Sequence, residues 1–413
     1  MDTPVSLAVI GAGQRGRLFG DIISRLPQWA SVSAVAEPRR DYREAFASRH
    51  GLSGAQVAVD WRELAGGPQR FDGVVICTQD RDHVEPAVTF LGKGCHLFLE
   101  KPMAPTLEGC QQIADAQRRA GTMSCVCHSL RYHAGFAALK SLLTSGRIGQ
   151  VVTIDQLEQV AWWHQAHSFV RGAWANEGRA SFMLLTKSCH DIDYVAHLAG
   201  TGCRRVSSFG SLSWFRKENA PPGSGERCTD CRAEKSCPYS AIRHYVEADR
   251  EAWPARVISL DHSREAHLQA ITDGPYGRCV WKCDNDVVDH QVVIMEFDNA
   301  ATATFTMTAF TGGEGRRIRV HGTEGDAQFS EDRMTVRTFA DGKTEEVAFE
   351  REPGGHGGGD ERAMASFLAA IRAKDPSLVR SDVQESLRTH AIVFAAERSR
   401  RQGRTVDMEE MEA

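Results

Sequence analysis

Two short stretches carry the residue types that acid–base chemistry needs. Glu100 and Lys101 directly follow a short apolar run, and His190 lies in a segment with helical apolar spacing. Lys187 precedes that histidine by three residues, and Asp191 follows it. An ammonium or imidazole group can exchange a proton with a substrate hydroxyl, and a carboxylate can orient the group that does so. We therefore expect Lys101, His190 and Lys187 to be the catalytic candidates.

The apolar run before Glu100 predicts a buried parallel strand. Residues 96–99 are His-Leu-Phe-Leu, Gly94 precedes them, and helix-like segments lie on both sides. Ligands bind at the carboxyl ends of the strands in such a sheet, so Glu100 and Lys101 are expected at a ligand site. Pro102 ends the strand, and its X-Pro bond is of the kind that can be cis.

A glycine-rich turn near the N-terminus predicts a dinucleotide-binding site. Residues 5–10 form an apolar strand, the glycines of a GxGxxG pattern follow at once, and residues 17–26 have helical spacing. In this pattern Gly11 permits a tight turn, Gly13 lets the backbone approach a pyrophosphate, and Gly16 lets the helix pack close to the strand. The free N–H groups at the helix N-terminus would bind the pyrophosphate.

An acidic residue at the end of the next strand favours NAD. Residues 32–36 form that strand, and Glu37 follows about twenty residues after the last glycine, where an acid binds the adenosine ribose hydroxyls. A carboxylate there would repel the 2′-phosphate of NADP. Arg39 and Arg40 lie close behind and could accept that phosphate, so NADP is not excluded. A solvated face after the strand is the alternative interpretation of these two arginines.

Strands and helices alternate through the rest of the first 125 residues. The pattern predicts strands at 73–77, 96–99 and 123–127, helices at 84–91 and 107–120, and a polar turn at 78–83. Alternation at this spacing indicates a doubly wound parallel sheet. We therefore predict an N-terminal Rossmann domain over residues 1–125.

With the glycine pattern, the turn from Thr78 to His83 and the Glu-Lys-Pro turn in one domain, the chain resembles the Gfo/Idh/MocA oxidoreductases. This family is named for glucose–fructose oxidoreductase and inositol dehydrogenase. The resemblance covers nearly the whole chain and implies a nucleotide domain followed by a sheet-rich domain. It implies that Glu100 contacts the nicotinamide ribose, that Lys101 points into the substrate site, and that Thr78 and His83 line the cofactor crevice. The cofactor-binding candidates are Gly11, Gly13, Gln14, Arg15, Gly16, Glu37, Thr78, His83, Glu100 and Lys101.

Residues 126–360 are expected to form an α+β domain with a large, open, mostly antiparallel sheet. Residues 361–413 are expected to be helices that pack back on the body. An open sheet usually covers its exposed face by pairing with another subunit, so we expect a homo-oligomer. Alternating polar and apolar residues predict strands at 151–159, 292–297, 302–307, 317–321, 325–329 and 334–338.

Residues 183–198 are predicted to form one helix. Lys187 and Asp193 lie three residues to either side of His190, on its face of the helix, so the aspartate could orient the imidazole. By resemblance this is the family's catalytic helix, which has a histidine followed three residues later by an aspartate. The family's commonest pattern also has an aspartate or asparagine four residues before the histidine. Here that residue is Thr186, whose hydroxyl cannot assist proton removal as a carboxylate does.

The two lysines suggest another source of a base. If Lys101 and Lys187 lie close together, each destabilises the charged form of the other, which would make either a better base near neutrality. This is a hypothesis, and it predicts different pH–rate profiles for a Lys101→Arg and a Lys187→Met variant.

The substrate candidates come from several segments. The resemblance places substrate-facing residues just after the first domain. Acids, an amide and an imidazole gather in residues 283–290, and such groups bind paired sugar hydroxyls, although a polar turn is an equal alternative. A glycine-rich loop at 352–360 carries a histidine that could close over a substrate like a lid. The substrate candidates are Arg131, Tyr132, Asp191, Asn285, Asp286, His290 and His356.

A cysteine-rich insertion spans about residues 215–285. Cys-x2-Cys is a common half-site for tetrahedral zinc, and a segment with too few apolar residues for its own core could take folding energy from a metal. An iron–sulfur cluster and free, packed thiols are the alternatives. The predicted zinc ligands are Cys228, Cys231, Cys237 and Cys279, with Cys283 as the other choice for the fourth position.

Net charge and hydrophobicity argue against a nucleic-acid-binding or membrane protein. The net charge of −5 is mild, and acids and bases are interspersed, so nothing indicates a nucleic acid or an anionic membrane as partner. No apolar run approaches the length of a membrane span, and the first residues lack the pattern of a signal peptide. We expect a cytoplasmic protein with reduced thiols.

Three functions follow as hypotheses. The first is an NAD(P)-dependent dehydrogenase acting on a secondary hydroxyl of a sugar, glycoside or cyclitol. The second is a redox-neutral NAD-dependent glycoside hydrolase acting through a transient 3-keto sugar, which some relatives are. The third is a non-catalytic NAD(H) sensor, which the presence of Glu100, Lys101 and His190 argues against.

Overall fold

Six parallel strands form the first sheet of the computed structural model, which describes residues 3–350 and 356–411. The strand order is β3-β2-β1-β4-β5-β6, so the direction of winding reverses between β1 and β4, where a doubly wound sheet opens its crevice. The prediction of a Rossmann sheet is confirmed. The strands are β1 (Val5–Ile10), β2 (Ala30–Ala36), β3 (Val57–Ala58), β4 (Gly73–Ile76), β5 (His96–Leu99) and β6 (Ser124–Val126).

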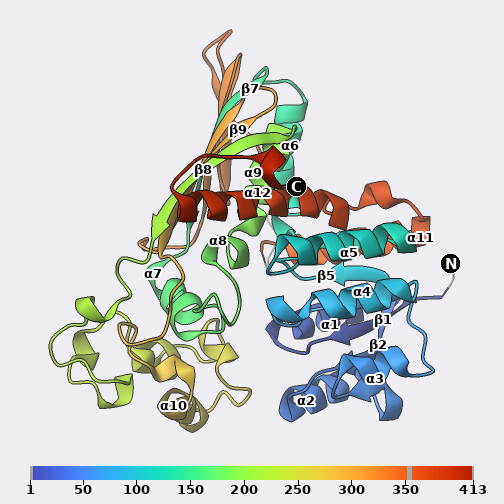
Figure 1. The fold of residues 1–413 in the computed structure, drawn as a ribbon, viewed down its shortest axis with the longest axis vertical. Helices are drawn as coiled ribbons and strands as arrows, with labels where there is room; N and C mark the ends of the chain where they lie inside the picture. Colours follow the sequence, from blue (N-terminus) through green and yellow to red (C-terminus); the bar gives the residue numbers. More distant parts are fainter. Residues whose placement is uncertain (1–2, 351–355, 412–413) are drawn as a thin grey trace.

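Helices cover both faces of this sheet (Figure 1). The strands are apolar on both sides, as in β4, where all four residues are buried. The helices between the strands are α1 (Gln14–Ser24), α2 (Arg40–His50), α3 (Trp61–Gly66), α4 (Val84–Gly92) and α5 (Leu107–Ala120).

One helix on this sheet comes from the far end of the sequence. Helix α11 (Gly359–Ala373) packs beside α1, and Phe367 meets Phe98 of β5 at 5.6 Å between ring centroids. Met364 and Leu368 enter the same apolar cluster. The first sheet therefore depends on residues that follow the second domain.

Nine strands form the second sheet, in the order β14-β13-β12-β11-β7-β10-β9-β8-β15. All neighbours pair antiparallel except β7 and β10, so the prediction of a mostly antiparallel sheet is confirmed. The strands are β7 (Val151–Gln159), β8 (Cys203–Ser211), β9 (His290–Phe297), β10 (Thr302–Thr308), β11 (Gly315–Gly322), β12 (Gly325–Ser330), β13 (Arg333–Thr338), β14 (Thr344–Glu346) and β15 (Val406–Asp407).

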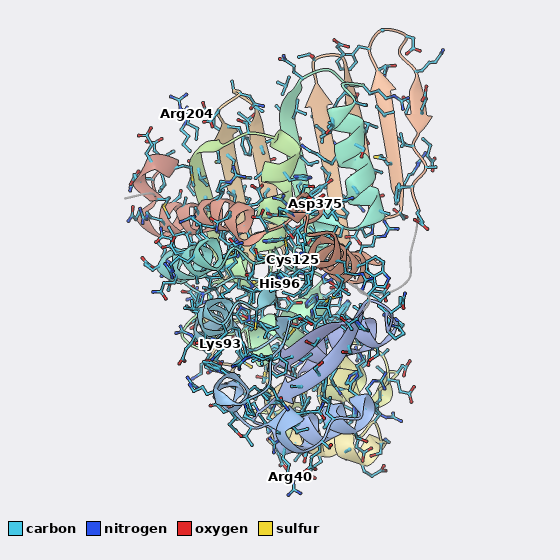
Figure 2. All side chains as sticks on the ribbon, turned by 90° about the vertical axis from the view of Figure 1, so that its right-hand side faces the viewer. Arg40, Lys93, His96, Cys125, Arg204 and Asp375 are labelled. Carbon is cyan, nitrogen blue, oxygen red and sulfur yellow. The ribbon has the colours of Figure 1, made fainter. Side chains whose placement is uncertain are left out.

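Helices cover one face of the second sheet: α6 (Ala134–Thr144), α9 (Cys189–Ala199) and α12 (Val383–Gln402). Figure 2 shows the layers turned by 90°, with Arg40 at the end formed by the first sheet and Arg204 at the end formed by the second. Helix α12 also packs on α5 and so joins the two halves (Figure 1). Nowhere in 3–350 or 356–411 is a helix both long and apolar enough to cross a membrane.

The predicted helix 183–198 is wrong in one respect. It consists of a short helix, α8 (Met183–Thr186), and α9, with Lys187 and Ser188 between them. The Thr186 hydroxyl donates back to the Phe182 and Met183 carbonyls at 3.4 Å each, a local bond that competes with regular helix geometry. The Lys187 and Ser188 residues therefore form a junction between two helices.

The insertion between β8 and β9 has two small apolar cores of its own. One is built around Phe215, Tyr239 and Trp281, and the other around Tyr245 and Ile271. The expectation that the insertion lacks apolar residues for a core is therefore wrong. Its regular elements are short turns and α10 (Arg264–Asp273), and α7 (Trp162–His164) with the following π-helical turn (Gln165–Arg171) lies against it.

Candidate functional site

A cavity of about 500 Å³ lies where the glycine turn of the first sheet meets the second domain. Gln14 and Arg15 line it from the glycine turn, and Lys187, Arg316 and His356 line it from the second domain. A larger cavity, of about 680 Å³, lies between α5, α9 and α12, and its lining contains none of the predicted catalytic or cofactor residues. We therefore assign the candidate active site to the smaller cavity.

The glycine turn has the shape that a pyrophosphate requires. Gly11 has φ +89°, and a Cβ atom there would lie 2.7 Å from the Cys77 carbonyl oxygen. A Cβ atom on Gly16 would lie 1.9 Å from the Gly11 carbonyl oxygen, so only glycine fits at either position. Helix α1 begins directly after the turn, and its first turn contains no acid. Its free N–H groups can therefore receive a phosphate.

Glu37 is buried at the end of β2, beside the glycine turn. It accepts a hydrogen bond from the Ala12 N–H at 2.9 Å and a bidentate pair from Arg39 at 2.7 and 2.9 Å. Burial alone would raise the pKa of Glu37, but the hydrogen bonds from Arg39 and Ala12 outweigh it and hold the pKa below its usual value. The carboxylate is thus charged and fixed at the place where an adenosine ribose would bind.

The Glu-Lys-Pro turn is held by residues of the first domain. The Lys101–Pro102 peptide is cis. His83 is buried behind the turn, with Nδ1 2.8 Å from the Pro102 carbonyl oxygen and Nε2 3.3 Å from that of Thr78. The Thr78 hydroxyl donates to the Asp82 carbonyl oxygen at 3.0 Å. His83 therefore positions the turn from behind.

Arg15 joins three segments that are far apart in the sequence. Its Nε lies 2.5 Å from Glu100, and its two terminal nitrogens lie 2.7 and 2.9 Å from Asp360 at the start of α11. Burial alone would raise the pKa of Asp360, but the charge of Arg15 holds it well below its usual value. The resemblance did not predict this bridge, because the partner of Arg15 lies 345 residues away.

Lys101 reaches from the first domain to the break between α8 and α9. Its ammonium donates to the Thr186 carbonyl oxygen at 2.5 Å, and the Lys187 carbonyl oxygen lies at 3.5 Å. Lys101 does not itself line the cavity, but it contacts Lys187, which does. The break in the helix therefore supplies the acceptors that hold this ammonium group.

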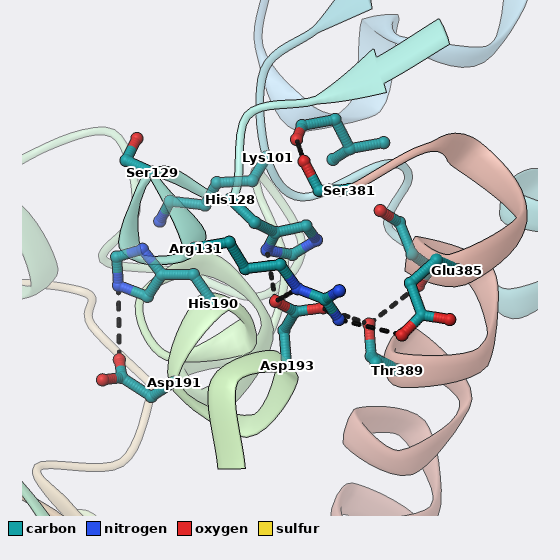
Figure 3. Close-up of polar contacts among 12 residues, drawn as sticks. Lys101, His128, Ser129, Arg131, His190, Asp191, Asp193, Ser381, Glu385 and Thr389 are labelled. Atoms are coloured by element: carbon teal, nitrogen blue, oxygen red, sulfur yellow. Dashed lines mark hydrogen bonds and ion pairs between the residues drawn. The ribbon is translucent and has the colours of Figure 1, made fainter. Parts of the chain in front are cut away.

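His190 lies beside Lys101 in Figure 3. Arg316 donates to its Nε2 at 2.9 Å, and Asp191 lies 3.2 Å from the same nitrogen. Burial and the charges of Lys101 and Arg316 lower the pKa of His190 well below its ordinary value. The imidazole is therefore neutral near pH 7, with Nε2 as a hydrogen-bond acceptor. Its ring centroid is 5.9 Å from that of His356.

Asp193 does not orient His190, which corrects the prediction from their spacing. Figure 3 shows Asp193 turned toward Arg131, which donates to it at 2.7 and 2.8 Å. The Thr389 hydroxyl of α12 donates to it at 2.9 Å. Burial alone would raise the pKa of Asp193, but the Arg131 charge lowers it well below the usual value. The Asp193 carboxylate therefore links α9 to Arg131 and, through Thr389, to α12.

The structure brings only part of the predicted substrate set to the cavity. His356 lines it, whereas residues 352–355 of the predicted lid lie outside the described residues. Asp191 is buried behind Arg316, which donates to it at 2.9 Å. Arg131 and Tyr132 are buried in contacts with Asp193 and with Ser381 and do not line the cavity.

The predicted 283–290 cluster also lies elsewhere. Asn285 donates to the Phe215 carbonyl oxygen, Asp286 accepts from Asn176 and from the Glu177 N–H, and His290 lies on Asp289. These contacts fix the insertion to its neighbours, as the alternative of a polar turn implies. None of the three side chains lines the cavity.

Two charged residues that the sequence did not single out form the floor of the cavity. Glu158 of β7 lies 2.9 Å from the Lys187 ammonium and 2.7 Å from Arg316, and all of its side chain is buried except about 1%. Burial raises the pKa of Glu158 above its usual value, although the charges of Arg316 and Lys187 act in the opposite direction. The signal was present in the alternation of β7, where Glu158 is on the inward face with Ile154. The Lys187 ammonium thus has a carboxylate partner in the floor of the cavity.

The four predicted zinc ligands line one small cavity in the insertion. Arg171 and the Ala241 N–H both approach the Cys228 sulfur at 3.4 Å. Within residues 3–350 and 356–411, however, no three His, Cys, Asp or Glu side chains are grouped so that they could hold a metal ion. The zinc prediction is therefore not supported, and the thiols of Cys228, Cys231, Cys237 and Cys279 are free.

Comparisons with known proteins agree with this architecture. A family model described as an oxidoreductase family with an NAD-binding Rossmann fold matches residues 5–128, and the model of the C-terminal α/β domain of that family matches residues 140–408. YteT of Bacillus subtilis, named as an oxidoreductase, is 24% identical over 326 residues, which cover 74% of this chain and 73% of that protein.

Two further proteins resemble this chain, one over about a third of its length and the other over nearly all of it. An inositol 2-dehydrogenase of Klebsiella pneumoniae is 32% identical over 146 residues, which cover 35% of this chain and 43% of that protein. A solved structure of levoglucosan dehydrogenase in complex with NADH and levoglucosan has a TM-score of 0.73 at 18% identity. It covers 98% of this chain and 99% of that chain, and the likeness shows a common fold.

Proposed function

The chain belongs to the Gfo/Idh/MocA family of oxidoreductases, and from this premise we propose that it is an NAD-dependent dehydrogenase of a sugar, glycoside or cyclitol. It would transfer a hydride between the nicotinamide and a secondary hydroxyl of that substrate. One observation carries the proposal: residues of the glycine turn and charged residues of the second domain line the same cavity. A cofactor and a substrate can thus meet beside groups that exchange protons.

Lys101 is the proposed acid–base residue. Carbonyl oxygens of Thr186 and Lys187 orient its ammonium, and a substrate hydroxyl that displaced one of them would be within reach of the same proton. His190, with Nε2 held by Arg316, is fixed beside it as a neutral hydrogen-bonding group. When NAD is bound, it supplies the hydride acceptor.

The choice of NAD over NADP rests on Glu37. Arg39 is bound in a bidentate pair to that carboxylate, and Arg40 is paired with Glu44. Both arginines close behind Glu37 therefore have partners other than a 2′-phosphate. The other proposed cofactor contacts are Gly11, Gly13, Gln14, Gly16 and Glu100, and the relatives with nicotinamide complexes support the same cofactor.

We also propose that the chain forms a homo-oligomer through the second sheet. The face away from α6, α9 and α12 exposes apolar side chains on two neighbouring strands: Phe209 of β8 and Ile294 of β9. Another copy of the same face would cover them. Size-exclusion chromatography with light scattering would test this, and a monomer at micromolar concentration would contradict it.

The decisive experiment is to follow NADH absorbance with NAD and a panel of free sugars, cyclitols and nitrophenyl glycosides, while measuring aglycone release. NADH formed in proportion to substrate supports the dehydrogenase. Aglycone release without net NADH would support the redox-neutral glycoside hydrolase, an alternative that no contact described above specifically favours. Formation of neither product would overturn the proposal.

A further inference from the structure

The cysteine-rich insertion reaches the candidate active site through a short segment. Trp253 and Arg256 of that insertion line the cavity, on a segment more than fifty residues after the end of α9. The remainder of the lining comes from the first domain, from the second sheet and its helices, and from the loop before α11. The insertion thus forms one wall of the cavity. It can therefore contact a bound substrate, whether or not its cysteines bind a metal.

The segment is anchored on both sides of these two residues. The Trp253 ring lies 5.1 Å from Trp163 and 4.7 Å from His164, edge to face in both cases. Ala255 is 1% exposed in the second apolar core of the insertion. Arg250 donates to the Val246 and His262 carbonyl oxygens at 2.9 Å each. Arg256 therefore extends from a fixed backbone.

Arg256 differs from the other cationic side chains that line the cavity. Arg15 is paired with Glu100 and Asp360, Lys187 with Glu158, and Arg316 with Glu158 and Asp191. Among the residues that the structure describes, Arg256 has no carboxylate partner, and its side chain is exposed. A guanidinium group presents a planar pair of donors that matches an oxyanion.

We propose that Trp253 and Arg256 form a specificity subsite for a substrate that carries an anionic group, a carboxylate or a phosphate. The Trp253 ring packs against the apolar face of the sugar ring, and Arg256 binds the anionic group in a bidentate pair. The inference rests on the proposed function and deepens it by naming the substrate class. Neutral sugars would enter the same cavity with lower affinity.

Matched sugars that differ only at one carbon test the subsite. Isothermal titration calorimetry measures the binding of each sugar to the protein, with and without saturating NADH. One set is glucose, glucuronate and glucose 6-phosphate, and the other is galactose and galacturonate. A charged hydrogen-bonded pair predicts that the preferred anionic sugar binds about ten- to a hundredfold more tightly than its neutral counterpart. The carboxylate and phosphate arms identify which anion is preferred. Binding is measured without turnover, so the readout does not depend on catalysis.

Three variants locate the effect. Arg256→Gln should abolish the preference for the anionic sugar, whereas Arg232→Gln, an exposed arginine of the same insertion away from the cavity, should retain it. Trp253→Ala should weaken binding of every sugar by about five- to tenfold, and Trp253→Phe should restore most of that affinity.

The outcomes separate the two proposals. Equal binding of neutral and anionic sugars, or a preference that survives in Arg256→Gln, overturns the subsite, and NADH formation from any sugar then leaves the proposed dehydrogenase standing. No binding of any sugar overturns the subsite as well. The dehydrogenase itself falls only if no member of the larger panel yields NADH.

Discussion

The ammonium groups of Lys101 and Lys187 have different kinds of partner. At the end of the first sheet, the Lys101 ammonium meets backbone carbonyls of Thr186 and Lys187. On the second sheet, the Lys187 ammonium meets the buried carboxylate of Glu158, which Arg316 shares. Neutral acceptors can release an ammonium group to a substrate more easily than a buried counter-ion can. The difference favours Lys101 as the proton carrier and Lys187 as part of a rigid floor.

Substitution of Lys101 tests whether its ammonium group is the proton carrier, which is the first half of this comparison. Lys101→Met should lower kcat about 100- to 10,000-fold, since it removes the general acid–base group. The dissociation constant for NADH, measured by fluorescence, should change little. Lys93→Met, at an exposed position after α4, is the control. A kcat within threefold of the unsubstituted protein would exclude Lys101 from the chemistry.

Substitution of Glu158 tests the second half. Glu158→Gln leaves Lys187 and Arg316 buried without their shared counter-charge, so the free energy of unfolding in urea should fall by about 3 kcal/mol. Glu346→Gln removes an exposed pair with Arg333 and should cost less than about 1 kcal/mol. If both variants unfold at the same urea concentration, the floor is not the rigid element described above.

The free energy of unfolding should fall in acid because His128 is buried. Burial lowers the pKa of His128 to about 4, so between pH 6.5 and 4 the unfolded chain binds a proton that the folded chain does not. This contribution to stability is complete above pH 6.5 and is lost as the pH falls toward 4, by about 2 to 3 kcal/mol.

The comparison of urea unfolding at pH 7 and pH 4.5 measures that loss. His128→Phe should reduce the loss of stability by that amount, whereas His321→Gln, at an exposed position on β11, should leave the loss unchanged. An unchanged slope in His128→Phe would mean that other buried groups carry the acid sensitivity.

The smallest effect is expected at the cofactor end of the first sheet. Glu37→Gln should weaken NAD binding about tenfold, because a charged acceptor for the ribose hydroxyls is lost, and it should release Arg39. Binding of NADP relative to NAD should therefore improve. Glu44→Gln, whose carboxylate pairs with exposed Arg40, is the control, and equal effects of the two substitutions on the NAD/NADP ratio would contradict the role of Glu37.

The sequence was most informative where chemistry follows a strand directly. Gly11, Glu37 and Lys101 each come after an apolar run, and parallel strands bring their carboxyl ends to one edge. At these positions the local sequence pattern is enough to predict where the side chain lies in the fold. Alternation alone predicts six strands of the second sheet, and all six are present, whereas it does not predict β8, which has two adjacent arginines.

Prediction failed where position depends on distant partners. The sequence predicts Arg131 as a substrate ligand, but Asp193 and Glu385 bind it from two helices. Residues 283–290 have the composition of a sugar site, yet neighbouring loops use their polar groups. Polar side chains in a loop bind whatever the fold brings near them. Composition alone cannot distinguish a ligand from a neighbouring backbone.

The placement of α11 on the first sheet has a consequence for synthesis on the ribosome. The strands of that sheet are complete by residue 126, but the apolar face that receives Met364 and Phe367 stays uncovered until the chain has grown past residue 373. A fragment ending near residue 128 would expose that face and lack the partner that Arg15 finds in Asp360. The nascent Rossmann half must therefore remain incomplete, and in need of protection from aggregation, while the whole second domain is being made.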